Sequence, residues 1–558
     1  MKPSVKQGIA LGALLTMLVS GGCKVGSDYC APQATVNSTY LQVDQAKGIR
    51  QQVGADVSTW WSQIQDPILT RLTCEAVSNN LTLREALYRI QAARATLGAT
   101  QAAGKPQFAE SGGYTYGRSS NTQSDYNDYA VATSMAWEID VFGRLERSVE
   151  AANADMEELR ELYRNAYVIL CADVAQCYIN ARAYQEQIRI SEENIEIQQS
   201  TLEITQTKNQ FGSASKLDEN QALGVCRGTE ASVLTLQTQY QQTLNQISIL
   251  VGRPPGYVDE LMRAPAPIPS APEDIMVGIP ADLLRRRPDI RAAEQRIIAQ
   301  NARVGVAIGD LYPIFSLNGS FGLDADSLSD MFNSDAINAS VGPSFRWNIL
   351  NFGRYRFNVE AQRLVQEQLI TAYRQAVLEA AQDVDNALAS YCNERDRLET
   401  LSDAVDAYTD AYELSNERYK SGQIDFQRLL DSQAGKLSYE LQYIQCRASM
   451  MSSVVQLYRS LGGDWMGSTY TSAADYAQGG EYAPTLQAGQ GSSQRVLATD
   501  SNDVGPVSAR YTTKDEDAPL AYNPDAEWNE RRERSRQRVA IALQQDDAST
   551  MALGSEDL

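Results

Sequence analysis

Cysteines and carboxylates are the side chains of this sequence that could carry covalent or acid–base chemistry, because histidine is absent from all 558 positions. Without histidine, the commonest general base, the commonest metal ligand and the Ser-His-Asp triad are all missing. The cysteines form no CxxC pair and no zinc-binding spacing, and no nucleophile–base pair, phosphate loop or metal cluster is evident. The sequence therefore predicts no catalytic residue, no metal site and no cofactor, and we expect a protein that is not an enzyme.

One cysteine stands where a covalent modification is expected. Lysines precede an apolar stretch from Ile9 to Val19, which ends in Ser20-Gly21-Gly22-Cys23. A charged start, a short apolar core and small residues are typical of an export signal, and the stretch is too short to span a bilayer as a helix. A cysteine after small residues resembles a bacterial lipobox, although Ser20 stands where a large aliphatic residue is usual. We expect lipidation at Cys23; the alternative is an ordinary cleaved signal.

The charge balance narrows the class of partner. The formal net charge is -21 at pH 7, whereas binding to a phosphate backbone requires lysine and arginine. We therefore expect no nucleic-acid partner. An acidic surface or lumen suits contact with cations, but acidity is commonly a matter of solubility alone.

An internal repeat organises the chain. When the sequence is shifted by 210 positions, two segments align without a gap, and upstream a shift of 207 continues the match. The matches include Trp137 with Trp347, Phe142-Gly143-Arg144 with Phe352-Gly353-Arg354, Gly212 with Gly422, Arg84 with Arg291, and Pro106 with Pro313. Similarity at nearly one offset predicts two copies of one structural unit.

Each copy is predicted to contain a very long helix. The stretches from Arg144 to Phe211 and from Arg354 to Ser421 contain neither Gly nor Pro, and a helix of that length reaches about 100 Å. Apolar residues recur every seven positions, which predicts supercoiling against neighbouring helices. These are Val174, Ala181, Ile188, Ile195 and Leu202 in the first copy and Val384, Tyr391, Leu398, Val405 and Tyr412 in the second. A simple antiparallel coiled coil and a broad wall of helices both remain open, and the partly polar seam favours the wall.

Four segments alternate with period two and are predicted to be β-strands, one hairpin in each repeat. They are Phe108–Arg118, Asp128–Phe142, Ile314–Leu323 and Ala339–Phe352. Four strands cannot close a barrel, an open sheet edge is not tolerated in lipid, and exposed aromatic strands in water would aggregate. We therefore expect several copies to combine.

Several stretches carry a resemblance to a known family. They are Val25-Gly26-Ser27-Asp28-Tyr29, Trp60-Trp61 with Asp66-Pro67, Gly252-Arg253-Pro254-Pro255 and, as the closest match, the stretch from Pro280 to Glu294. In these the chain resembles the outer membrane factor family of Gram-negative bacteria, the TolC and OprM type, and especially its lipoprotein, NodT-like branch. Ser27 replaces the proline usual there. The resemblance covers Cys23 to Gly463.

The resemblance implies a mixed α/β membrane protein with mainly long α-helical coiled coils and four β-strands per protomer. Three protomers would form a 12-stranded β-barrel in the outer membrane and a periplasmic α-helical tunnel. The implied partners are the other copies of a homotrimer, a periplasmic adaptor (membrane fusion) protein, an inner-membrane RND-type pump and outer-membrane lipid. The expected function is passive conduction of drugs or other toxic small molecules to the outside. The alternative is a structural periplasmic coiled-coil lipoprotein without transport activity.

The expected domain organisation follows from the repeat and the resemblance. It comprises a signal peptide (1–22), a lipid-anchored extended segment (23–65), the first repeat (66–255), a linker (256–279), the second repeat (280–465) and an acidic tail (466–558). The tail lacks a lasting apolar period and is predicted to be disordered.

The resemblance also implies a gate where the long helices turn. Gly212 and Gly422 follow the two long helices and are expected to end them and to form the helix-turn tips that meet an adaptor. By motif position, Asp218 and Tyr419 resemble a pair whose hydrogen bond holds the tunnel shut.

Two further residues fall on constriction positions of the family. Asp431 keeps the family's acid, whereas Arg428 stands where an acid is frequent. Threefold symmetry would turn Asp431 into a ring that favours cations, and Arg428 is expected to pair with Asp431 and weaken that field. The alternative interpretation of all four gate residues is that they are solvated charges and caps beside helix turns.

Overall fold

The computed structural model describes residues 24–33, 37, 39–41, 49–51, 64, 66–118, 125–271, 275–277 and 286–463. Several expectations from the sequence lie outside these residues. They concern the signal peptide, lipidation of Cys23, Trp60-Trp61, the stretch from Pro280 to Arg285 and the tail from 466 onward.

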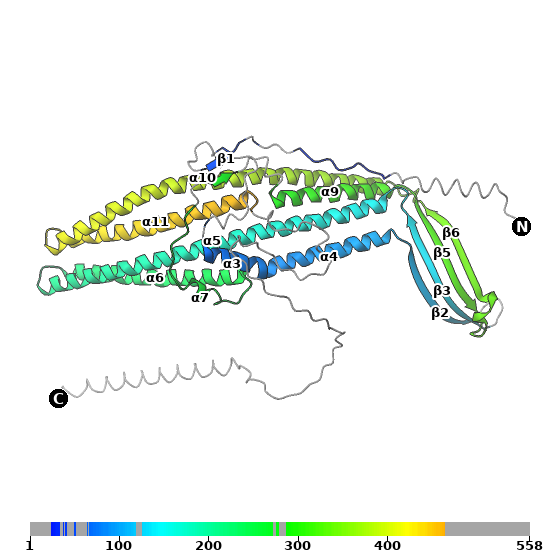
Figure 1. Cartoon of the computed structure of the whole chain (residues 1–558), viewed down its shortest axis with the longest axis horizontal. Coiled ribbons are helices and arrows are strands. Elements are labelled where there is room, and N and C mark those ends of the chain that lie inside the picture. Colours follow the sequence, from blue (N-terminus) through cyan, green and yellow to red (C-terminus); the bar gives the residue numbers. More distant parts are fainter. Residues whose placement is uncertain are drawn as a thin grey trace, which may run out of the picture. The chain divides into compact units, whose positions relative to one another are not determined.

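Two units with the same order of elements follow each other along the chain (Figure 1). The first contains α4 (Leu81–Ala103), β2 (Gln107–Arg118), β3 (Asp125–Ile139), α5 (Arg144–Gln210) and α6 (Lys216–Leu250). The second contains α9 (Pro288–Gly309), β5 (Ile314–Ala325), β6 (Ile337–Arg346), α10 (Arg354–Lys420) and α11 (Phe426–Ser460). Both long helices, α5 and α10, have 67 residues. The predicted combination of very long helices with two β-hairpins is confirmed.

Smaller elements complete the described chain. They are α3 (Pro67–Asn79), α7 (Asp259–Met262), two 3-10 turns (Asp330–Phe332 and Ser334–Ala336) and a short parallel pair, β1 (Ile49–Gln51) with β4 (Ile275–Val277). Sequence reasoning missed this pair, because two three-residue strands carry too little periodicity to be detected.

The Asp66-Pro67 motif is the start of α3. The Asp66 carboxylate accepts hydrogen bonds from the backbone N–H groups of Ile68 and Leu69, and Pro67 occupies the first turn, where no N–H donor is needed. The second carboxylate oxygen accepts a hydrogen bond of 2.6 Å from the Tyr178 hydroxyl on α5. This cap therefore also attaches α3 to the long helix.

The four long strands form one antiparallel sheet in the order β2-β3-β5-β6. In the first hairpin Gln107 lies opposite Ala136, and in the second Ile314 lies opposite Arg346. The repeat offsets of 207 and 210 positions carry the first pair onto the second. β3 and β5 join the two hairpins, so β2 and β6 are the edges of the sheet.

The predicted ends of two strands were wrong. β3 ends at Ile139 and not at Phe142, and β6 ends at Arg346 and not at Phe352. Trp137 lies near the end of β3 and Trp347 directly follows β6, and the two make equivalent contacts. Trp137 donates its indole N–H to the carbonyl of Gly104, and Trp347 donates its indole N–H to the carbonyl of Leu311. β3 has strand partners on both sides, whereas β6 has one, and a strand with a single partner loses ladder bonds first at its end.

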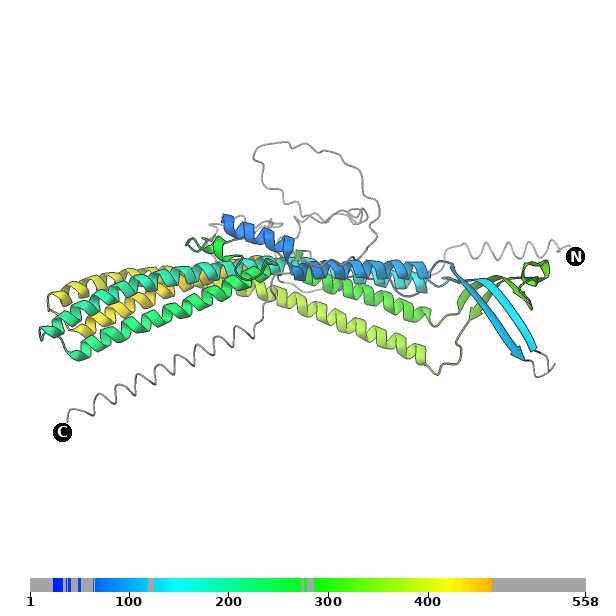
Figure 2. The same cartoon turned by 90° about the horizontal axis from the view of Figure 1, so that it is seen from below.

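The helices pack side by side in the order α4, α5, α9, α10, with α6 against α5 and α11 against both α10 and α5 (Figures 1 and 2). The largest cluster of buried apolar side chains lies where these helices meet α3. Its fully buried members include Leu69, Leu72, Ile179, Val384, Leu388, Met451 and Val454. Each helix in the described part of the chain is too short or too polar to cross a bilayer by itself.

The predicted seven-residue stripe holds only for part of α5. Val174 and Ala181 are fully buried, but Ile188, Ile195 and Leu202 are half-buried. Nearer the turn the buried side chains of α5 are polar, and they are Gln187, Ser191, Asn194, Gln198, Thr201 and Thr205. Gln187, Asn194 and Thr205 have polar partners on neighbouring helices, which an apolar period cannot reveal.

Candidate gate at the helix turns and clamp at the N-terminal segment

The two turns that follow the long helices have the same geometry. Gly212 and Gly422 have φ angles of 71° and 73°, a conformation that glycine adopts without a steric penalty. Ser213 N–H donates to the carbonyl of Lys208 at 2.7 Å, and Gln423 N–H donates to Arg418 at 2.8 Å. This is the hydrogen-bond pattern of a Schellman cap, which ends a helix and reverses the chain.

Tyr419 lies at the centre of the cluster where the two turns meet. Its side chain is 4% exposed and packs against Phe426, with ring centroids 5.7 Å apart. Thr205 on α5 already donates its hydroxyl to the Thr201 carbonyl, so the Tyr419 hydroxyl is the donor in the 3.3 Å hydrogen bond between Tyr419 and Thr205. Tyr419 therefore connects α10 to α5 across the two coiled coils.

Lys208 strengthens this connection. Its ammonium nitrogen lies 3.9 Å from the centroid of the Tyr419 ring and donates a hydrogen bond to the backbone carbonyl of Tyr419. A cation over an aromatic face is attracted by the ring quadrupole, and more strongly where water is partly excluded. Burial lowers the pKa of Lys208, in keeping with this partly dry position.

The electrostatic surroundings keep the Tyr419 hydroxyl protonated. Burial raises the pKa of this phenol, the hydrogen bond with Thr205 opposes the rise, and the negative charge of Asp218 adds to it. A protonated phenol remains a hydrogen-bond donor at neutral pH.

Asp218 acts as a helix cap within the described chain. Its carboxylate accepts a hydrogen bond from Ser215 N–H at 3.0 Å, while the Ser215 hydroxyl accepts one from Asp218 N–H at 3.1 Å. This reciprocal pair is a capping box at the start of α6. The hydroxyl of Tyr419 is directed to Thr205, so the expected bond between Asp218 and Tyr419 is not formed within the subunit.

The expected pairing of Arg428 with Asp431 is not formed within the subunit. Arg428 instead lies 3.9 Å from the carboxylate of Asp425, which caps α11, and both side chains are exposed. Asp431 accepts a hydrogen bond of 2.8 Å from Gln427. Asp425 and Asp431 are both three positions from Arg428 along the chain, and the Asp425 carboxylate also accepts a hydrogen bond of 3.4 Å from the backbone N–H of Arg428.

Sequence reasoning missed Thr205 and Lys208 as partners of Tyr419. The position of Lys208 in the last turn of α5 could have predicted a contact with backbone carbonyls, because a basic residue there commonly interacts with the free carbonyls of a helix end. Nothing in the sequence, however, indicated that those carbonyls would belong to the other repeat.

A polar seam between α5 and α11 continues from this cluster. Gln187 donates to Gln445 at 3.2 Å and Asn194 donates to Glu440 at 3.1 Å. The buried oxygen of the Gln198 amide has no partner in the described part of the chain. Exposing polar side chains to water costs less free energy than exposing apolar ones. The two coiled coils therefore meet along a seam that can separate at a low cost in free energy.

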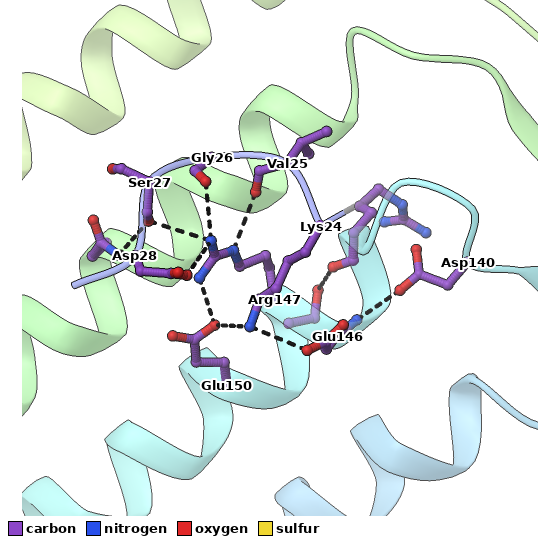
Figure 3. A network of polar contacts seen from close by, with 12 residues as sticks. Lys24, Val25, Gly26, Ser27, Asp28, Asp140, Glu146, Arg147 and Glu150 are labelled. Carbon is purple, nitrogen blue, oxygen red and sulfur yellow. Dashed lines mark hydrogen bonds and ion pairs between the residues drawn. The ribbon is translucent and has the colours of Figure 1, made fainter. Parts of the chain in front are cut away.

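At the opposite end of α5, Arg147 holds the segment from Lys24 to Tyr29, here called the N-terminal segment (Figure 3). The Arg147 side chain is 1% exposed. Its guanidinium donates to the carbonyls of Val25 at 3.2 Å and Gly26 at 3.2 Å, and to the Asp28 carboxylate at 3.0 Å. One side chain therefore fixes the course of successive residues.

Further contacts make this clamp fit closely. A side chain at Gly26, whose φ is +88°, would lie 3.0 Å from the backbone of Gly305 on α9. The Tyr29 hydroxyl donates to Glu294 on α9 at 3.0 Å. The Val25-to-Tyr29 motif thus contacts the end of the Pro280-to-Glu294 motif.

Acidic side chains complete the clamp. Glu150 accepts hydrogen bonds from Arg147 at 2.8 Å and forms an ion pair with Lys24 at 2.9 Å. Burial by itself would raise the pKa of Glu150, but the hydrogen bonds from Lys24 and Arg147 outweigh it and hold the pKa below its usual value. Glu150 is therefore charged at neutral pH, which stabilises both cations.

Comparison with known proteins assigns the family. The family described as outer membrane efflux protein matches residues 72–253 and 279–463. Outer membrane protein OprJ of Pseudomonas aeruginosa is 29% identical over 467 residues, which cover 82% of this chain and 97% of OprJ. Nodulation protein T of Rhizobium leguminosarum bv. viciae is 29% identical over 449 residues, which cover 80% of this chain and 90% of that protein.

Solved structures agree with this assignment. The outer-membrane channel OprN is 31% identical, has a TM-score of 0.74, and aligns with 79% of this chain and all of its own (100%). The outer membrane channel CmeC of Campylobacter jejuni is 21% identical, also with a TM-score of 0.74, and covers 79% of this chain and 95% of its own; it supports the fold alone. The chain therefore belongs to the outer membrane efflux protein family, whose members are channel-forming proteins of the bacterial outer membrane.

Proposed function

We propose that this protein is the outer-membrane exit duct of a tripartite efflux system, through which toxic small molecules pass passively from an inner-membrane pump and a periplasmic adaptor to the outside. The observation that carries the proposal is the four-stranded sheet with two free edges, joined directly to helices of 67 residues. Its exposed side chains include Phe108, Tyr114, Tyr116, Val341 and Phe345.

Association of three copies accounts for these features. A sheet edge in lipid would leave backbone N–H and C=O groups without partners, at a cost of several kcal/mol each. Three sheets of four strands close into a barrel of twelve, and the helices that continue from them then line a tunnel. The trimer thus seals the membrane sheet and builds the duct in one step.

The helix turns form the gate of this duct. In each subunit, Tyr419, Thr205 and Lys208 hold the two coiled coils together at the periplasmic end. Asp218, Arg428 and Asp431 remain half-buried or exposed there, so they are available to neighbouring subunits, and a ring of Asp431 favours cations. Gly212 and Gly422 form the tips that the adaptor meets.

The gate has its own test. Tyr419→Phe together with Asp218→Ala removes a hydrogen bond across the coiled coils and weakens the cap beside it, at about 1 kcal/mol per bond in each subunit. We expect a higher single-channel conductance in planar bilayers. Thr207→Ala, which removes an exposed hydroxyl bonded to the Glu203 carbonyl within α5, is the matched control; equal conductance of the unmodified protein and both variants would reject the gate.

Cys23, which directly precedes Lys24 in the sequence, is proposed to carry the lipid anchor. Mass spectrometry of the mature N-terminal peptide tests this; an unmodified first residue would contradict it.

The class of compound that is transported is inferred from the names of relatives. Relatives in Pseudomonas putida are named as toluene, solvent and antibiotic efflux pump outer membrane proteins. A passive duct supplies no energy, so the pump makes most of the choice of compound. We infer that small apolar or amphipathic toxic compounds pass through it.

Dye accumulation in cells tests the function. Cells that lack this protein should accumulate a fluorescent apolar dye. Cells that express the intact protein again should export the dye. Sensitivity to a large glycopeptide, which an intact outer membrane excludes, controls for leakage. Equal accumulation with and without the chain would overturn the proposal. Membrane fractionation followed by an unboiled SDS gel separates the two functions. A monomer recovered from the inner-membrane fraction would support the structural lipoprotein instead.

A further inference from the structure

We propose that ordered water binds in the polar seam between α5 and α11, where it bridges the buried amides of Gln198 and Gln433, and that this hydration lets the two coiled coils of a subunit part at low cost. One coiled coil is formed by α5 with α6 and the other by α10 with α11. The inference rests on the proposed gate and adds a water site to it, above the helix turns.

The side chains of α5 that are buried along the seam are polar where a coiled coil is normally apolar. Their spacing of three and four residues is that of a coiled-coil core, and each is at most 7% exposed. The internal repeat offers a comparison, because the positions of α10 that lie 210 residues further on include Leu401, Ala404, Tyr408 and Ala411. A polar core is therefore a property of α5 in this seam and is not required by the packing of long helices as such.

The register of the two helices brings Gln198 and Gln433 to nearly the same level. α5 and α11 run antiparallel, with Gln187 bonded to Gln445 and Asn194 bonded to Glu440. When this register is continued toward the helix turns, Gln433 lies opposite the turn of α5 that follows Gln198. The two residues are therefore separated by no more than about 6 Å along the helix axis.

Three amide atoms of this stretch are buried and have no partner in the part of the chain that the structure describes. They are the side-chain oxygens of Asn194 and Gln198 and the side-chain nitrogen of Gln433. All three residues are 2–3% exposed. Gln198 offers an acceptor and Gln433 a donor, yet the two are not bonded to each other, so a gap separates complementary groups. Buried polar groups without a protein partner commonly bind water, because an unmade hydrogen bond is costly.

A water molecule meets the requirements of this gap. It can donate to the Gln198 oxygen and accept from the Gln433 nitrogen at the same time, which neither amide can do for the other across the gap. A second molecule, one turn further along α5, serves the Asn194 oxygen. The site is thus built from neutral groups and takes a small neutral ligand.

Solvent reaches the seam through a cavity beside it. The cavity has a volume of about 600 Å³ and is bounded on one side by Gly228 and Ser232 of α6. Three residues of the seam line it as well, namely Gln187, Ser191 and Gln445. The buried amides begin one helical turn below Ser191, so water that fills the cavity lies next to them.

Hydration changes the free energy needed to part the coiled coils. When an apolar seam opens, its side chains meet water for the first time, and the cost grows with their area. When this seam opens, amides that already bind water exchange it for bulk water. The seam therefore fixes the register of the two coiled coils but resists their separation weakly, and the contacts of Tyr419 at the helix turns remain the main restraint.

Leucines in place of both amides test this consequence. Gln198→Leu with Gln433→Leu removes two unpartnered atoms and puts apolar side chains of similar size in the gap. Exposing about half of a leucine side chain should lower the ratio of open to closed channels roughly 3- to 10-fold for each leucine. The ratio is measured in planar bilayers in the background of Tyr419→Phe with Asp218→Ala, which loosens the gate. An unchanged ratio would overturn the role of the seam.

Gln199→Leu in the same background is the matched control. Gln199 is exposed and lies one position along α5, and its neighbour Glu230 keeps an ion pair with Arg227 at 2.6 Å. The same change of side chain at this position should leave the ratio of open to closed channels as it is.

A crystal structure of the purified protein, at a resolution that shows ordered water, tests the site itself. We expect density within hydrogen-bond distance of both the Gln198 oxygen and the Gln433 nitrogen, and its loss in the double leucine variant. A direct hydrogen bond between the two amides, with no density between them, overturns the proposal. This measurement does not depend on conduction.

Thermal unfolding separates an effect on the seam from simple misfolding. Either leucine alone leaves the opposite amide buried without its water bridge, so each single variant should melt below the double variant. A double variant that melts below both single variants rejects the water-filled gap. Should Tyr419→Phe with Asp218→Ala fail to raise the conductance, the gate is rejected, while the density and the order of melting temperatures still decide on the water site.

Discussion

Arg147→Ala should release the N-terminal segment from the body of the subunit. The substitution removes the donor to the carbonyls of Val25 and Gly26 and to the Asp28 carboxylate. It also removes one of the two cations that face Glu150, which keeps Lys24.

The magnitude follows from the exposure of each partner. Asp28 is 89% exposed, so its ion pair contributes about 0–1 kcal/mol. The carbonyl contacts of 3.2 Å are long and can be replaced by water, so together they contribute about 1 kcal/mol. The half-buried pair with Glu150 contributes about 1.5–3 kcal/mol as a charge-assisted bond. We expect a loss of about 2.5–5 kcal/mol, which shifts the ratio of docked to released segment roughly 70- to 5,000-fold.

Trypsin cleavage after Lys24 measures this ratio, because cleavage of a transiently released segment follows its population when closing is fast. The rate in Arg147→Ala should rise by the factor above, with an intermediate rise in Arg147→Lys, which keeps the charge but not the planar fork. Arg160→Ala, which removes an ion pair with Glu157 elsewhere on α5, should leave the rate unchanged. Equal rates in Arg147→Ala and the unmodified chain would refute the clamp.

Three other outcomes are expected. Because the pKa of Glu150 is held below its usual value, the clamp is at full strength above that value, near pH 4.5, and weakens as the pH falls through the lower folded value. Protection of the N-terminal segment from hydrogen exchange, relative to the intrinsic rate at the same pH, should therefore be high at pH 6 and low near pH 3. Lys208→Met should loosen the helix turns by about 1 kcal/mol through loss of the contact with Tyr419, seen as more frequent channel openings, and unchanged gating would count against that contact. Gly252→Ala should lower the thermal stability by about 1–3 kcal/mol, since φ is +74° and the added carbon would lie 2.4 Å from a carbonyl oxygen, whereas Gly224→Ala on an open helix face should not.

The repeat, the two long helices and the hairpins could be predicted because their signals are local. The absence of Gly and Pro between Arg144 and Phe211, together with the seven-residue apolar period, predicts a long helix, and Gly212 marks its end. Alternation of side chains likewise predicts a strand without knowledge of its partner. These signals carry no information on which strand lies opposite which, and the hairpin registers had to come from the structure.

The contacts of the candidate gate depended on distant residues and could not be predicted. Tyr419 is directed to Thr205 and Lys208, which lie more than two hundred positions away along the chain. Arg428 was expected beside Asp431 but lies nearer the cap residue Asp425. The clamp was missed for the same reason, because the sequence around Arg147 reads as an ordinary polar helix and only the fold brings the N-terminal segment onto it.

The end of β6 shows what a single subunit leaves open. The sequence predicted a strand beyond Arg346, and the isolated subunit has none. The residues after Arg346 correspond to the part of β3 that pairs with the other hairpin, whereas β6 has no second partner strand in the described subunit.

The most direct test of the central claim is the current carried by the purified protein in a planar lipid bilayer. Copies that combine into a water-filled duct should produce discrete steps of conductance, small while the helix turns are closed and larger when Tyr419→Phe and Asp218→Ala loosen them. Protein that inserts into the bilayer but produces no steps, with or without these substitutions, would contradict the account.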